Sequence, residues 1–181
     1  MNGRRMRRVR YSVAASLDGY IAGPNGEFDW IPMDPEIDFG AMLAQYDTVL
    51  MGRHSYELML GMEQEQSWIG GLETFVFSRT LQQSDHPKVR IVAEGYIPLV
   101  QRLRSEVTPE SKDIWLFGGG VLFASLAEAG LVDRVEVAVV PLLLGGGIPL
   151  LPPPASRVRL TLERHRVYPN SGIVLLEYAV E

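Results

Sequence analysis

Three glycines end a strongly apolar run and lead into a helix-like pattern in the segment DIWLFGGGVLF, residues 113–123. Because Gly118, Gly119 and Gly120 have no Cβ, a ligand could approach the backbone closely, and free N–H groups at a helix start favour an anion such as pyrophosphate. The segment has neither the Lys-Ser/Thr of a Walker loop nor the GxGxxG spacing. A glycine-rich turn that serves packing alone would give the same pattern, so both interpretations stay open here.

Two further strand ends carry side chains that suit an anion. The run VLMGRHSYE places Arg53 between a strand and a helix start, where a guanidinium can bind a phosphate through two hydrogen bonds. Pairing with a nearby acid is the commoner role of an isolated arginine. The run FVFSRT ends in Ser78, Arg79 and Thr80, which suit a phosphomonoester, although hydroxyl residues after a strand are common in turns. Ligands of open α/β sheets bind outside the carboxyl ends of the strands, so the three ends together favour a phosphate-bearing ligand.

The elements that must position these residues follow from the hydrophobic pattern. Runs rich in β-branched and aromatic residues predict strands at 9–15, 48–51, 74–77, 89–93, 114–117, 135–140, 157–167 and 173–180. Helical patterns predict helices at 36–45, 54–60, 97–106 and 121–129. Pro35 suits the first turn of the first helix, and Gly130 suits the residue just after the last one.

The order of these elements predicts the fold class. Alternating strands and helices require crossovers and so a largely parallel sheet, whereas the tetrad PNSG at 169–172 is too short for a crossover and predicts a final antiparallel hairpin. The apolar runs IWLF and VEVAVV indicate strands covered on both faces. We therefore expect one α/β domain at 9–181, a mixed, mostly parallel sheet of about eight strands flanked by helices, preceded by a flexible arginine-rich tail at 1–8.

Composition excludes several classes of function. The 181 residues include no cysteine, which rules out disulfides, thiolate zinc sites and thiol nucleophiles, and the three histidines lack metal-ligand spacing. No apolar run reaches the ~20 residues of a membrane helix. Five arginines lie in the first ten residues, so the rest of the chain is more acidic than its net charge of −5, which argues against nucleic-acid binding. No apolar stretch follows Arg4 and Arg5, so we expect no export signal and a cytoplasmic protein.

Four motifs now stand in order: AASLDGYIA at 14–22, MGR at 51–53, FSRT at 77–80 and GGG at 118–120. In this order and spacing the chain resembles dihydrofolate reductase. It resembles more closely the C-terminal reductase domain of bifunctional riboflavin-biosynthesis enzymes and its stand-alone relatives, from about Val9 to Tyr178. The resemblance implies the dihydrofolate-reductase-like fold and an NADPH-dependent reductase. Its substrate would be a small C=N or C=O compound of the pteridine or ribosylated-pyrimidine type. A homodimer is also implied, to which the stretch VEVAVVPLLL could contribute.

The resemblance also implies roles for single residues in binding NADPH. Ala14 and Ala15 match the first-strand pair beside the nicotinamide, and Ile21 matches the mobile-loop residue that covers it. Arg53 and His54, with Gly52 and Ser55 beside them, match the positions that bind the adenosine phosphates. Ser78, Arg79 and Thr80 match the segment around the 2′-phosphate. The pyrophosphate would lie against the residues of the glycine turn and helix start, which are Gly118, Gly119, Gly120, Val121 and Leu122. The 2′-phosphate segment is why NADPH is expected rather than NADH.

The catalytic acid has several candidates. Dihydrofolate reductase carries an acid on its first helix, where this chain has Asp34, Glu36 and Asp38. We select Asp38 as the proton source, directly or through a water, because Met42 one turn later would face the same way. A capping or solvated acid fits as well, and Asp34 directly before a proline is a natural N-cap. Asp18 matches the SLDG motif of the riboflavin-type relatives, where it could orient the loop rather than do chemistry.

The chain also departs from these families. The deaminase zinc signature cannot exist without cysteine, so the chain is not the bifunctional enzyme. The pterin pocket of the folate enzymes is not recognisable. A second glycine run, LGGGIP at 144–149, matches a loop of the riboflavin-type relatives near the active site, although a bulged connection is the simpler explanation.

Two alternatives to a reductase remain. One is a non-catalytic or regulatory nucleotide-binding module on the same fold. The other is a role of the arginine-rich tail as an anchor for an acidic partner.

Overall fold

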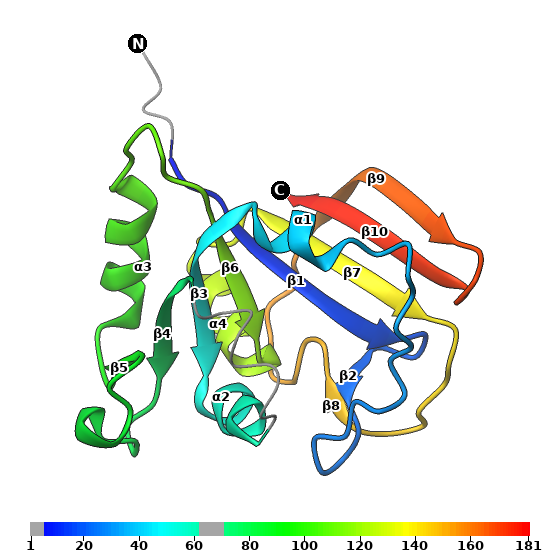
Figure 1. The fold of residues 1–181 in the computed structure, drawn as a ribbon, viewed down its shortest axis with the longest axis horizontal. Coiled ribbons are helices and arrows are strands. Elements are labelled where there is room, and N and C mark those ends of the chain that lie inside the picture. The colour runs from blue at the N-terminus through cyan, green and yellow to red at the C-terminus, as the bar shows by residue number, and fades with distance from the viewer. Residues whose placement is uncertain (1–5, 62–70) are drawn as a thin grey trace.

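A computed structural model describes residues 6–61 and 71–181 of the chain (Figure 1). Its centre is an eight-stranded sheet in the order β5-β4-β3-β6-β1-β7-β10-β9. The strands of this sheet are β1 (Val9–Ser16), β3 (Tyr46–Gly52), β4 (Glu73–Phe77), β5 (Arg90–Val92), β6 (Asp113–Gly118), β7 (Arg134–Val140), β9 (Leu160–Tyr168) and β10 (Ile173–Val180). Two short strands, β2 (Tyr20–Ala22) and β8 (Ile148–Pro149), pair with each other beside it.

The sheet is parallel from β5 to β7 and antiparallel at β10 and β9. Ile173 pairs with Tyr168 across the turn at 169–172, which confirms the predicted hairpin. The first strand, β1, lies in the middle of the sheet between β6 and β7. The carboxyl ends of β1, β3, β4, β6 and β7 therefore meet at one edge, as the α/β prediction requires.

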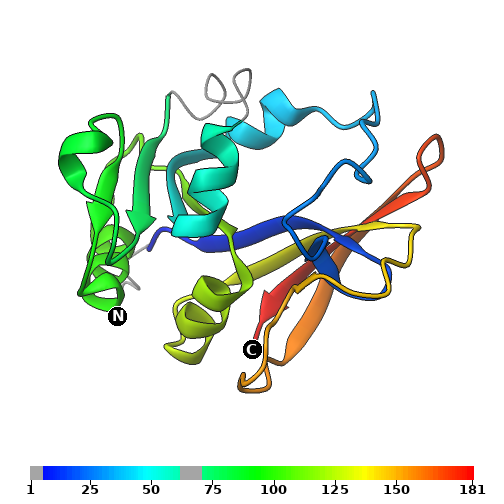
Figure 2. The same cartoon turned by 90° about the horizontal axis from the view of Figure 1, so that it is seen from below.

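Helices cover both faces of the sheet (Figure 2). They are α1 (Phe39–Leu43), α2 (Arg53–Leu60), α3 (Tyr96–Ser105), α4 (Gly120–Glu128) and a 3-10 turn, η2 (Gln83–Asp85). α3 and α4 pack with the main core on one face, here called the α4 face, and α1 and α2 pack on the other, the α2 face. Among the described residues no helix is long and apolar enough to cross a membrane.

The last helix ends where the sequence predicts. α4 ends at Glu128, and Gly130 follows in the left-handed conformation with φ of 65°. The Gly130 N–H donates to the Ala127 carbonyl at 3.0 Å, and the next N–H reaches back to the Leu126 carbonyl at 2.9 Å. These bonds satisfy helix-end carbonyls, which is why glycine is favoured after a helix.

The first helix is shorter than predicted. The expected helix at 36–45 is α1 at Phe39–Leu43, and Pro35 lies outside it. Asp34 does not cap this helix, because its Oδ1 accepts from the Glu36 N–H at 2.9 Å and its Oδ2 accepts from the Ser171 N–H at 3.1 Å. A tertiary contact with the β9–β10 turn thus holds residues 34–37 in a non-helical turn.

The structure also differs from the expected flexible tail at 1–8. Residues 1–5 lie outside the described residues, but Arg7 is buried. Its guanidinium pairs with Asp47 and donates to Thr48 Oγ1 at 2.7 Å and to the Lys112 carbonyl at 2.8 Å. Polar partners on β3 and before β6, which no local pattern reveals, anchor this arginine to the domain.

Candidate functional site

Two helix starts lie side by side at the carboxyl edge of the sheet. Gly52 is the N-cap of α2 and Gly119 that of α4, and neither helix has a side-chain cap among the described residues. A Cβ at residue 52 would lie 3.7 Å from the Gly119 nitrogen, and one at Gly118 would lie 3.6 Å from Ser55 Oγ. The peptide bond between Gly118 and Gly119 is cis. Uncapped N–H groups of two neighbouring helix starts form a place suited to a negatively charged group.

The third glycine of the run is required by packing. A Cβ at Gly120 would lie 2.7 Å from the carbonyl oxygen of Pro149 and 2.7 Å from Cδ of Pro152. After it, Leu122 is buried in the core while Val121 is exposed. The packing interpretation of the glycine run therefore holds at residue 120, and the open backbone belongs to residues 118 and 119.

Arg53 is paired with an acid on its own helix. Its Nη1 lies 3.1 Å from Oε1 of Glu57, one helical turn later, and its Nη2 lies 3.4 Å from Nε2 of His54. Both Arg53 and Glu57 are partly exposed, and His54 is mostly exposed. This is the pairing that the sequence offered as the alternative, although the guanidinium still lies at the start of α2.

The segment after β4 divides its three polar residues between two roles. Ser78 is buried, and its Oγ accepts from the N–H groups of Thr80 at 3.2 Å and Leu81 at 3.1 Å. These bonds close the turn, as hydroxyl residues commonly do after a strand. Arg79 and Thr80 are exposed, and within residues 6–61 and 71–181 Arg79 forms no ion pair. Only these last two side chains are presented to a ligand.

Asp18 connects two loops beyond the end of β1. Its Oδ1 accepts from Ser16 Oγ at 2.6 Å and from the Leu144 N–H at 3.0 Å, and its Oδ2 accepts from the Gly145 N–H at 2.7 Å. The Ser16 hydroxyl and the backbone N–H groups lower the pKa of Asp18, which keeps the carboxylate charged. The glycine run at 144–149 lies between β7 and β8, and Asp18 holds it against the turn that leads into β2. Ile21, expected in a mobile loop, lies in β2 and packs against the main core.

The candidate acids before α1 have structural partners. Asp38 is the N-cap of α1, and its Oδ1 accepts from the Ala41 N–H at 2.8 Å. Asp34 is buried, and hydrogen bonds from Ser171 and from the Glu36 backbone lower its pKa. Asp38, the acid selected from sequence, is exposed and so remains accessible to water.

Part of the α2 face is uncovered in the middle of the sheet. We call this region the open strip; its residues are Ser12, Ala14, Phe117, Ala138 and Leu175. All are partly exposed although β6, β1 and β7 are central strands, so no layer covers them fully. In Figure 2 the helices α1 and α2 lie above one part of this face and the segment at 23–38 above another. Because these residues are partly exposed, solvent reaches the strip.

The two alanines expected beside the nicotinamide face opposite sides of the sheet, because side chains alternate along a strand. Ala14 belongs to the open strip. Ala15 is buried in the main core of the α4 face. Of this pair, only Ala14 offers its side chain to a ligand on the strip.

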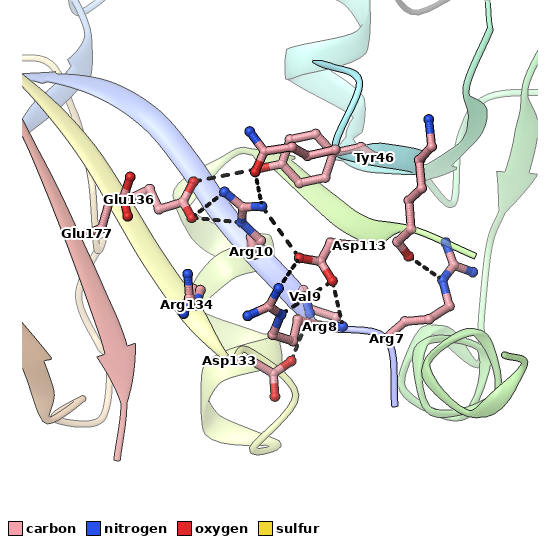
Figure 3. A network of polar contacts seen from close by, with 12 residues as sticks. Arg7, Arg8, Val9, Arg10, Tyr46, Asp113, Asp133, Arg134, Glu136 and Glu177 are labelled. Atoms are coloured by element: carbon pink, nitrogen blue, oxygen red, sulfur yellow. Dashed lines mark hydrogen bonds and ion pairs between the residues drawn. The ribbon is translucent and has the colours of Figure 1, made fainter. Parts of the chain in front are cut away.

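A buried polar network lies beyond the strip, toward the amino ends of the parallel strands (Figure 3). Nε and Nη2 of Arg10 each lie 2.7 Å from Glu136 Oε1, and Nη1 donates to Gln45 Oε1 at 2.8 Å. The Tyr46 hydroxyl lies 3.5 Å from Glu136 Oε2, and the Arg10 guanidinium lies 4.9 Å from the centre of the Tyr46 ring. Sequence reasoning missed this network. The sequence indicates the network only through one charged residue within each of two apolar strands, Arg10 in VRY and Glu136 in VEV.

Comparison with known proteins gives concordant matches. The model of the family described as RibD C-terminal domain matches residues 7–174. The uncharacterized protein YyaP of Bacillus subtilis (strain 168) is 33% identical over 187 aligned positions, which span 98% of this chain and 97% of the relative. A putative riboflavin biosynthesis protein from Shewanella sp. PV-4 superposes with a TM-score of 0.79 at 26% identity, covering 97% of this chain and 99% of the other.

A second solved structure resembles the chain over part of its own length. It is a diaminohydroxyphosphoribosylaminopyrimidine deaminase/5-amino-6-(5-phosphoribosylamino)uracil reductase from Thermotoga maritima, with a TM-score of 0.69 at 15% identity. The match covers 97% of this chain and 57% of that protein. At this identity the likeness concerns the fold alone.

Proposed function

The chain belongs to the RibD C-terminal domain family, and on that premise we propose that it is a reductase that uses the hydride of NADPH to reduce a small C=N or C=O compound of the pteridine or ribosylated-pyrimidine type. The observation that carries the proposal is the pair of glycine-capped helix starts, α2 and α4, side by side at the carboxyl edge. They would hold the pyrophosphate, because their N–H groups are open and a Cβ there would fill the space.

The remaining contacts of the cofactor follow from the exposed side chains around this edge. Arg79 and Thr80 would bind the 2′-phosphate, which supports NADPH over NADH. Arg53 would contribute at the start of α2 at the expense of its pair with Glu57. Ala14, on the open strip, would leave room for the nicotinamide because its side chain is a single methyl group. The chain's main contribution is thus to orient the two reactants beside each other.

Proton delivery requires a group at the edge of the strip. Asp38 is exposed and could hold the water that protonates the reduced heteroatom while its Oδ1 caps α1. Asp18 would position the turn between β1 and β2 rather than exchange protons, since its carboxylate accepts from three donors.

The second candidate function is a nucleotide-binding module without turnover. The specific observation in its favour is that both acids selected from sequence, Asp18 and Asp38, accept structural hydrogen bonds. Such a module would bind the nucleotide at the same site but would not transfer a hydride to a substrate. Binding and turnover therefore have to be measured separately.

The test is a calorimetric titration with NADPH and with NADH, followed by NADPH oxidation in the presence of dihydropterins and ribosylated pyrimidines. We expect NADPH to bind more tightly than NADH, and Arg79→Ala to weaken NADPH about tenfold while changing NADH little. Arg102→Ala, an exposed arginine on α3, is the control. Absence of binding of either nucleotide at millimolar concentration would refute both candidates. Binding without oxidation by any compound would favour the module.

We also propose that the protein is a homodimer formed through the α4 face of β7, β10 and β9. A cavity of about 480 Å³ lies there, and its lining includes Val137, Leu176 and Tyr178. On β9, Leu162 is 49% exposed and Val167 is 54% exposed. An apolar sheet face of this kind is commonly buried against another protein surface, and a two-fold axis would bury it on both copies at once.

A further inference from the structure

One row of residues crosses the open strip from β1 to the edge of the sheet. Ala14 on β1 is paired with Ala138 on β7, which is paired with Leu175 on β10. Leu175 is in turn directly opposite Arg166 on the edge strand β9. Residues opposite each other on neighbouring strands share a face, so all four side chains lie on the α2 face. Neighbouring strands are about 4.8 Å apart, which places the backbone of Arg166 about 14 Å from that of Ala14. The row thus leads from the proposed nicotinamide position to a cation.

The guanidinium of Arg166 lies on this face and is accessible. Its Cζ lies 4.6 Å from the centre of the ring of Tyr168, two residues later on the same side of β9, and its side chain is 57% exposed. Tyr168 is buried in a cluster against which Trp30 and Ile37 pack from the segment above the strip. Arg166 therefore lies beside this cover and next to the row that a ligand would occupy.

The acids around Arg166 hold it loosely. Oε2 of Glu36 lies 3.7 Å from its Nη2, which is too long for a hydrogen bond, and Oε1 of Glu36 accepts from Asn170 Nδ2 at 3.1 Å. The pKa of Asp34 is lowered mainly by its hydrogen bond from Ser171 and to a smaller extent by the charge of Arg166. Both oxygens of Asp34 already accept from backbone N–H groups. The fork of the guanidinium therefore remains open to a bidentate contact with an anion.

The other charges close to this row are paired at short distances. Nε of Arg164, two residues earlier on the same side of β9, lies 2.8 Å from Oε2 of Glu177. Glu136 lies 2.7 Å from Arg10. Among the residues that the structure describes, Arg166 is thus the cation beside the row that a new anion can engage without breaking a short ion pair.

Resting on the proposed function, we propose that Arg166 determines substrate specificity by binding an anionic group, a phosphate or a carboxylate, at the end of the substrate remote from the bond that is reduced. A guanidinium matches the oxygens of either anion with two parallel hydrogen bonds. With its reducible ring beside Ala14, the substrate would extend over Ala138 and Leu175 toward β9. It should therefore be elongated, with a spacer such as a sugar between the ring and the anion.

The experiment compares probes that differ at the group offered to Arg166. The protein is saturated with NADP⁺, so that the phosphate positions of the cofactor are filled, and is then titrated calorimetrically with uridine, uridine 5′-phosphate or uridine 5′-carboxylate. We expect at least one of the two anions to bind about tenfold more tightly than uridine, because it gains a charge-assisted contact. Tighter binding of only one anion, or of both, shows which group the arginine accepts.

Variants separate recognition by Arg166 from its effect on folding. Arg166→Ala should bring the affinity for the anion down to that for uridine and leave uridine unchanged, and Arg166→Lys should retain part of the preference. Glu36→Gln should strengthen the anion, because a competing carboxylate is removed while Asn170 keeps an acceptor oxygen. Arg90→Ala, which changes an exposed arginine on the opposite edge strand β5, is the control, and thermal unfolding verifies that each variant is folded.

The outcomes distinguish this inference from the proposed function. Failure of NADP⁺ to bind would refute the cofactor site. If NADP⁺ binds, three results would overturn the inference alone: equal affinity for uridine and both anions, an anion preference that persists in folded Arg166→Ala, or binding of none of the three probes up to millimolar concentration.

Discussion

Gly145 donates its backbone N–H to Oδ2 of Asp18 over 2.7 Å, although the two residues are 127 positions apart in the chain. The contact joins the loop after the first strand to the glycine run that follows β7. Since the same carboxylate also accepts from Leu144 and Ser16, one side chain sets the position of both loops at the carboxyl edge of the sheet.

Acid should release this contact. The folded-state pKa of Asp18 is lowered, so its stabilising effect is present above the ordinary aspartate value near ~3.9 and is lost as the pH falls through the lower folded value. We expect the exchange protection of the Leu144 and Gly145 amides, measured by hydrogen exchange and corrected for intrinsic rates, to decline below about pH 4. In Asp18→Asn one of the two oxygens becomes an NH₂ group that cannot accept, so protection of at least one of the two amides should be weak and should no longer depend on pH. The exposed Asp29→Asn should behave as wild type; an identical acid profile in Asp18→Asn would contradict the prediction.

Breaking the buried ion pair should be costly. Arg10→Leu leaves Glu136 buried with its main partner removed, for which we expect a loss of about 3–5 kcal/mol in the free energy of unfolding, measured by urea titration. The double variant Arg10→Leu/Glu136→Leu removes both charges and should be more stable than Arg10→Leu alone. A double variant that loses the sum of the two single effects would show that the residues act independently.

The two glycines Gly120 and Gly146 should respond differently to a methyl group. Gly120→Ala places a Cβ 2.7 Å from the Pro149 carbonyl oxygen, so we expect a loss of about 1–3 kcal/mol in unfolding free energy. Gly146→Ala meets no atom within 4 Å and should change stability little. Thermal unfolding of both variants checks this, and equal melting temperatures would argue against the close approach at residue 120.

The role of Asp38 can be divided between capping and proton transfer. Asp38→Ala removes the N-cap and should destabilise the protein by about 1 kcal/mol, whereas Asp38→Asn keeps an acceptor oxygen and should preserve stability. If Asp38 holds the proton-delivering water, NADPH oxidation should nevertheless slow in Asp38→Asn, and the pH profile should change shape. If turnover and the pH profile are unchanged in the folded Asp38→Asn variant, Asp38 caps α1 and takes no part in proton transfer.

The apolar face of β9 offers a test of the dimer. Leu162→Glu places a charge on the surface proposed to be buried between two copies, and we expect it to yield monomers in sedimentation velocity at micromolar concentration. Val107→Glu changes a residue of similar exposure, 40%, away from this face and should leave the oligomeric state unchanged. A monomeric wild type, or a Leu162→Glu variant that still dimerises, would exclude this interface.

The fold was predictable wherever a local pattern and a tertiary requirement agree. The strand at 173–180 and the helix stop at Gly130 were predicted correctly because alternation, apolar burial and the left-handed glycine all act over a few residues. The helix at 36–45 was predicted too long because Asp34 has the signature of an N-cap. Asp34 instead accepts a hydrogen bond from the Ser171 N–H, which lies in the β9–β10 turn far away in the sequence.

The candidate site was predictable in its backbone and less so in its side chains. Glycines at strand ends indicated where N–H groups would be open, and the structure brings those at 52 and 119 together. Burial of Ser78 depends on neighbours that the spacing does not reveal, whereas the pairing of Arg53 with Glu57 is a contact between residues four apart on one helix. The open strip could not be predicted, because it is defined by what fails to cover Ser12 and Ala14 rather than by those residues themselves.

The central place of β1 has a consequence for how the protein is made. Residues 9–16 leave the ribosome well before their neighbours, residues 113–118 and 134–140, so about a hundred further residues must be synthesised before this strand can be paired. Until then the backbone N–H and C=O groups on both edges of this apolar segment have no strand partner. Because its pairing partners are far away in the sequence, folding is expected to be slow. Nascent chains stalled before residue 113 should therefore be the ones that depend most on chaperones.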